Sequence, residues 1–107
     1  MIGKGNGDLN AVVWPRGART VTVGELAGRL DSLEGKTIAQ LWDYLFRGDE
    51  IFPLLEEGLA QRIPGVKFVN FEVFGSTHGD EEHQVLADLP AKLKRHGVDA
   101  VISGMAC

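Results

Sequence analysis

The sequence predicts one α/β domain in which strands and helices alternate along the chain. From Lys36 onward, short apolar runs rich in β-branched and aromatic residues alternate with longer segments whose apolar residues recur every three or four positions. Glycines fall at most of the joints between these segments, as is typical of turns. A chain of 107 residues has room for a single domain, because typical domains run to about 100–150 residues.

The composition is that of an ordinary globular protein. Hydrophobic residues make up 44% and charged residues 24%, which argues against disorder, a coiled coil or a collagen-like chain. The net charge of −4 disfavours general binding to nucleic acid or to an anionic membrane. One Cys and three His cannot supply an internal disulfide or a Cys/His zinc framework. We expect neither a metal nor another cofactor.

The chain carries no predicted membrane or export signal. No apolar run approaches the ~20 residues of a membrane span. Residues 1–10 lack the apolar core of a signal peptide, so we expect a cytoplasmic protein.

Residues 1–35 are predicted to be a leader that precedes the regular domain of residues 36–107. Within the leader, residues 11–15 and 21–23 can each form a short strand, the first ended by its proline.

A buried strand is predicted over residues 36–42, which follow a turn at Gly35 and include β-branched and aromatic residues. A helix is expected next, with Asp49 as its N-cap and Pro64 just beyond its last turn. The apolar residues of this helix recur at three- and four-residue steps: Ile51, Leu54, Leu55, Leu59 and Ile63.

The second half of the domain continues this pattern. It consists of a strand over residues 66–74, a loop over 75–79, a helix over 80–96 and a third strand over 98–103. Gly97 is placed to end the helix, and Pro90 inside the helix predicts a kink or a break.

Strands separated by helices of this length predict a parallel sheet with right-handed crossovers. The expected fold is a three-layer half of a doubly wound sheet, Rossmann-like or flavodoxin-like, with strand order 2-1-3. It is expected to be incomplete, because no helix follows the third strand to cover it. Ligands of such sheets bind beyond the carboxyl ends of the strands. Three loops occupy that position, at residues 43–49, 75–79 and 104–107.

The loop after the first strand offers two candidate substrate-binding residues. Asp43 can orient a substrate hydroxyl or a neighbouring imidazole, although forming the turn is an equally good role for an aspartate. Arg47 can hold an anionic substrate beside a helix N-terminus, or it can pair on the surface with Asp49 or Glu50.

The loop after the second strand contains Ser76, Thr77 and His78 between two glycines. Such a loop can bind an anion through backbone N–H groups and hydroxyl donors. His78 is the best candidate for proton transfer at neutral pH, the alternative being a solvated loop side chain.

Cys107 follows the third strand and is the candidate catalytic nucleophile or redox group. Because the carboxyl ends of parallel strands meet at one edge, Asp43, the three residues of the 76–78 loop and Cys107 are expected to converge there.

Three segments carry a resemblance to a known family: Leu30-Asp-Ser-Leu-Glu-Gly-Lys-Thr-Ile38, Arg62-Ile-Pro-Gly-Val66 and Val98-Asp-Ala-Val-Ile-Ser-Gly104. Together with Asp43, they resemble the family named for its UGSC motif, in which U is selenocysteine or cysteine. The family motif follows the last strand by a few residues, and here the chain ends at Cys107. We therefore expect a truncated N-terminal portion that is inactive as it stands. Either Cys107 is the first position of the motif and Gly-Ser-Cys is lost, or the motif would begin at the next residue, where a UGA codon read as a stop would truncate the protein.

The resemblance implies thiol or selenol redox chemistry with a small-molecule or thiol substrate. The alternative is a small non-enzymatic α/β binding or assembly module whose sheet is completed by another chain. In either case the exposed apolar strand predicts a homo-oligomer formed through residues 98–107.

Overall fold

The computed structural model of the chain describes residues 11, 17 and 24–106. The two short strands expected in the leader and Cys107 lie outside the described residues. The elements are β1 (Thr37–Trp42), α1 (Gly48–Arg62), β2 (Lys67–Val69), the 3₁₀-helix η1 (Phe71–Val73), α2 (Glu82–Arg95) and β3 (Ala100–Gly104).

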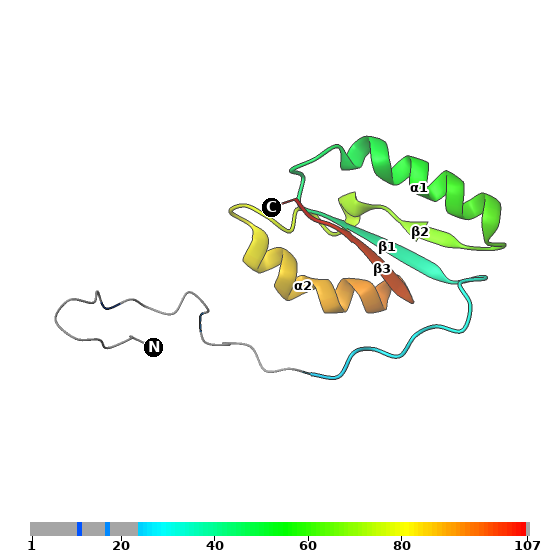
Figure 1. Cartoon of the computed structure of the whole chain (residues 1–107), viewed down its shortest axis with the longest axis horizontal. Helices are drawn as coiled ribbons and strands as arrows, with labels where there is room; N and C mark the ends of the chain where they lie inside the picture. The colour runs from blue at the N-terminus through cyan, green and yellow to red at the C-terminus, as the bar shows by residue number, and fades with distance from the viewer. Residues whose placement is uncertain (1–10, 12–16, 18–23, 107) are drawn as a thin grey trace.

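The three strands form one parallel sheet in the order β2-β1-β3, which confirms the predicted α/β fold. The chain runs from β1 outward to β2 and then back past β1 to β3. With right-handed crossovers, this path places the two helices on opposite faces of the sheet. Figure 1 shows that arrangement, with α1 and α2 on either side of the strands. The molecule therefore has three layers.

The core is centred on β1, the middle strand. Ile38, Ala39, Gln40 and Trp42 of this strand are all buried, as expected of a strand covered on both faces. The Gln40 side chain donates a hydrogen bond from Nε2 to Glu56 Oε1 of α1 at 2.6 Å. The alternate residues Gln40 and Trp42 therefore face α1.

The second strand is much shorter than the predicted strand of residues 66–74. After Val69 the Asn70 side chain accepts the backbone N–H of Glu72 at 2.8 Å, and this contact starts η1 instead of extending the sheet. The turn buries both Phe71 and Phe74: the Phe71 ring packs with Phe52 of α1, and the Phe74 ring lies beside His96 at the end of α2. The aromatic run looked like a strand because its residues are apolar, but the hydrogen bond to the Asn70 side chain favours a turn.

Three smaller expectations about the helices and the third strand were wrong. Helix α1 begins at Gly48 without a side-chain cap, so Asp49 lies in the first turn instead of capping it. Helix α2 continues through Pro90 without a break. Strand β3 begins at Ala100 and not at the predicted residue 98, because the Val98 N–H still donates to the Leu93 carbonyl near the end of α2. Asp99 exchanges hydrogen bonds with Thr37 at the start of β1, one of them through its side chain.

The close contact between Gly48 and the Trp42 ring gives a stability prediction. A Cβ at position 48 would lie 2.5 Å from the Trp42 ring, so Gly48→Ala should lower the free energy of unfolding by about 1–3 kcal/mol, as overpacking does. Urea unfolding measures the change.

Gly58→Ala is the matched control in the same helix. A Cβ at position 58 meets nothing within 4 Å, so this variant should be neutral or more stable by up to about 1 kcal/mol. Equal effects of the two substitutions would contradict the assigned packing.

Candidate functional site

Asp43 lies at the carboxyl end of β1 and is 3% exposed. Its backbone N–H donates to the carbonyl of Gly104 at 3.3 Å, which continues the pairing of β1 with β3. Its two carboxylate oxygens accept from different segments: Oδ1 from the N–H of Leu45 at 3.1 Å, and Oδ2 from the N–H of Ala106 at 2.7 Å. One side chain therefore joins the loops that follow β1 and β3.

The loop of residues 75–79 reaches the same place from β2. The N–H of Thr77 donates to the carbonyl of Trp42 at 3.1 Å, and Ser76 forms an isolated parallel bridge with Trp42. Ser76 Oγ lies 2.7 Å from the His78 carbonyl and 3.3 Å from that of Asp43, and it accepts the His78 N–H at 3.1 Å. The loop is thus held against the end of β1, and Thr77 Oγ1 is buried there with no partner among the described residues.

An aromatic cluster forms a wall beside these loops. The Tyr44 ring stacks on the Trp42 ring with ring centroids 4.2 Å apart. The Phe71 and Trp42 rings pack edge to face with their centroids 4.8 Å apart. Tyr44 has a φ of 64°, an uncommon backbone conformation for a residue other than Gly, Asn or Asp. The stacking on Trp42 offsets the cost of that conformation. Burial raises the pKa of the Tyr44 phenol, and the nearby charge of Glu72 raises it further.

The structure brings together three of the candidate residues, namely Asp43, Ser76 and Thr77. His78 is joined to Ser76 through its backbone, and its side chain is exposed. Arg47 is exposed and pairs with Glu50 at 3.5 Å, in line with its surface alternative. Cys107 lies outside the described residues, but it directly follows Ala106, which bonds to Asp43.

Two parts of this site were missed by reasoning from the sequence. Ala106 contributes only a backbone N–H, and no residue type marks that role. The sequence did contain a sign of the aromatic cluster, because aromatic residues occupy every second position from the last residue of β1 onward: Trp42, Tyr44 and Phe46. This alternation does not predict that the Tyr44 ring stacks on Trp42.

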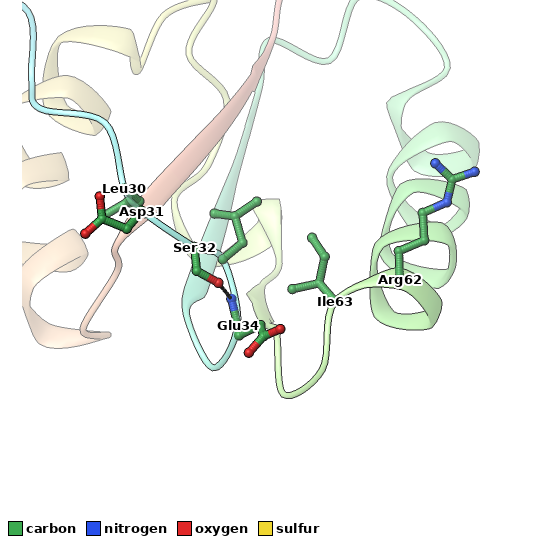
Figure 2. Close-up of a pocket in the computed structure, with 7 residues that line it drawn as sticks. Leu30, Asp31, Ser32, Glu34, Arg62 and Ile63 are labelled. Carbon is green, nitrogen blue, oxygen red and sulfur yellow. Dashed lines mark hydrogen bonds between the residues drawn. The ribbon is translucent and has the colours of Figure 1, made fainter.

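Surface hollows also occur outside the contacts of Asp43. One, of about 330 Å³, is at the opposite edge of the sheet, where Figure 2 shows the segment before β1 beside the end of α1. Its residues are Leu30, Asp31, Ser32, Leu33, Glu34, Arg62 and Ile63. The hydrogen bond drawn there, from the Glu34 N–H to Ser32 Oγ at 3.0 Å, closes a local turn.

A second hollow, of about 510 Å³, lies between η1 and α2 and reaches Gly75. It is rich in carboxylates, and Lys92 Nζ at its side donates to the Val73 carbonyl at 3.2 Å. In the part of the chain that the structure describes, no group of three or more His, Cys, Asp or Glu side chains is arranged to hold a metal ion. Neither described α-helix has the length and apolar character needed to cross a membrane.

Comparison with known proteins gives one match. A family model described as the UGSC family matches residues 11–107 of the chain. No curated protein and no solved structure matches the chain.

The raised pKa of Tyr44 predicts how its phenol titrates. Tyr44 is the only tyrosine, so phenolate absorbance reports on it alone, and the midpoint should lie above 10.0 in the folded protein and return to about 10 in urea. Because folding favours the neutral phenol, its contribution to stability is complete below pH 10 and is lost as pH rises through the folded pKa.

Glu72→Gln should lower the midpoint without abolishing the shift, since burial is its larger cause. A midpoint equal to that in urea would contradict the stacked position of Tyr44.

Proposed function

The chain belongs to the UGSC family, and from that premise we propose that it is a thiol or selenol redox protein in which Cys107 supplies the reactive thiol of this chain. One observation supports the location most: the N–H of Ala106, the residue before Cys107, bonds to the buried Asp43 carboxylate where three loops meet. Reactive groups of parallel α/β sheets lie at this edge.

The chemistry we propose is disulfide exchange with a small-molecule disulfide. The Cys107 thiolate attacks one sulfur of the substrate, the substrate S–S bond breaks, and the departing thiolate takes up a proton. The chain has one cysteine, so a second small thiol from solution attacks the substrate sulfur in the mixed disulfide. Because this thiol comes from solution, we propose activity for the chain in place of the inactivity expected from the sequence. That step frees Cys107 as a thiolate and releases a new disulfide, so no other oxidant or reductant is consumed.

The neighbouring loop supplies the remaining roles. His78 is exposed beside the site and donates the proton to the departing thiolate. Ser76 and Thr77 contact the substrate in this proposal, and their partly exposed position beside Asp43 supports that role. Arg47 is exposed and available to an anionic part of the substrate. The proposed exchange needs Cys107 as a free thiol, and thiols stay reduced in the cytoplasm. We therefore propose that the protein is cytoplasmic.

The test compares the folded and unfolded chain. At pH 7, the second-order rate of mixed-disulfide formation with oxidised glutathione should be at least about three times higher for the folded chain than for the chain in urea. The factor is modest because a thiol that ionises more readily is also a weaker nucleophile. Mass spectrometry gives the rate and the modified residue.

Substitutions separate the roles. Cys107→Ser should abolish the adduct, and His78→Gln should lower the rate. His83→Gln, an exposed histidine on α2, should leave the rate unchanged. A folded-chain rate equal to that in urea would remove the proposed function.

A second candidate function, an assembly module, is favoured by the open edge of the sheet. β3 is an edge strand, and Val101, its second residue, is 42% exposed. An exposed apolar edge strand favours pairing with another chain. The partner we infer is a second copy of this chain, joined through β3 and the residues that follow it.

Sedimentation at increasing protein concentration tests this assembly. The chain should form dimers that bury at least about 1,000 Å², the size of a specific interface. Val101→Lys should give monomers. Leu54→Lys, a similar change at an exposed position of α1, should leave the dimers intact. A wild-type monomer at all concentrations would exclude the assembly.

A further inference from the structure

We propose that Asp43 is the positioning residue for the reactive thiol: its carboxylate fixes the backbone at Ala106, the residue to which Cys107 is covalently joined. This inference rests on the proposed redox function, and it replaces the substrate-binding role predicted for Asp43 from the sequence.

The burial of Asp43 is the first step of the argument. The side chain is 3% exposed, and the only ion pair among the described residues joins Arg47 to Glu50, so no cation there compensates its charge. A buried carboxylate is costly unless hydrogen-bond donors satisfy it. The N–H groups of Leu45 and Ala106 are the donors that do so.

The two donors have different roles. Leu45 is two residues away, so its bond to Oδ1 is local and fixes the orientation of the carboxylate. Ala106 is 63 residues away, so its bond to Oδ2 is a tertiary contact. At 2.7 Å it has the length of a charge-assisted hydrogen bond, which is roughly twice as strong as a neutral one. Oδ2 therefore restrains the residue next to Cys107.

The Asp43 backbone makes this restraint rigid. Its N–H continues the ladder between β1 and β3 by donating to Gly104, and its carbonyl lies 3.3 Å from Ser76 Oγ. Both contacts fix the Cα of Asp43 relative to the sheet. The segment after Gly104 is then held at both of its ends, by the ladder and by the carboxylate.

Asp99 offers a matched control at the opposite edge of the sheet. Asp99 Oδ2 accepts the N–H of Thr37 at 3.0 Å and so also ties β1 to β3 through a carboxylate and a backbone donor. Asp99→Asn therefore perturbs the same kind of contact between the same strands, but at the other end of β1 from the contact of Asp43 with Ala106.

The experiment measures hydrogen exchange of the Ala106 amide and the rate of Cys107 alkylation by iodoacetamide, in the full chain. Asp43→Asn should speed exchange at Ala106 by about tenfold or more, because the charged acceptor is lost. The alkylation rate should fall toward that of the urea-unfolded chain. Asp99→Asn should change neither quantity, and both variants are compared at conditions where circular dichroism shows them folded.

Two results would overturn the inference: wild-type exchange at Ala106 in Asp43→Asn, or equal changes at Ala106 in both variants. If Asp43→Asn does not fold, an NMR measurement on the wild-type protein tests the inference instead. A scalar coupling across the hydrogen bond should be detected between the Ala106 amide nitrogen and the Asp43 carboxyl carbon. Absence of that coupling also overturns it.

Failure of the redox proposal would appear separately, as equal Cys107 rates in the folded and unfolded wild type. The exchange rate at Ala106 would still report on Asp43.

Discussion

The carboxylate of Asp43 is the constraint on which the carboxyl edge of the sheet depends. A buried charge with no cation beside it among the described residues must be met by N–H donors, and those donors lie in two different loops. The chain can satisfy Asp43 only by bringing the segment after β3 to the end of β1. An electrostatic requirement at one residue thus determines where a loop more than sixty residues away is placed.

The core that supports this edge is small and largely aromatic. Trp42 and Phe71 pack with Phe52 of α1, and the absence of a side chain at Gly48 lets the Trp42 ring lie against the helix. Helix α2, in contrast, buries none of its residues fully, and apolar side chains such as Leu54 and Leu86 remain exposed on the two helices. Both the edge of the sheet and its helices therefore keep apolar surface that another strand, domain or chain can cover.

Family membership and geometry support the proposed chemistry in different ways. Membership in the UGSC family rests on a match over most of the chain, and the redox chemistry is our proposal from that premise. The geometry gives a place, because the loops after all three strands meet there. It also separates two kinds of group: the buried Asp43 carboxylate orients the backbone, whereas the His78 side chain is exposed to solvent.

The sequence by itself determined the alternation of strands and helices, because hydrophobic periodicity is a local property of the chain. It also determined the parallel sheet and its strand order, because right-handed crossovers through helices leave few possible topologies. It also identified Asp43, Ser76 and Thr77 as neighbours, because all three follow strand ends. Only the tertiary structure decided that Phe71 turns into the core instead of extending β2, and that Asp43 binds backbone N–H groups. Those outcomes depend on which donors and apolar surfaces meet across the fold, and a backbone N–H such as that of Ala106 leaves no mark in the sequence.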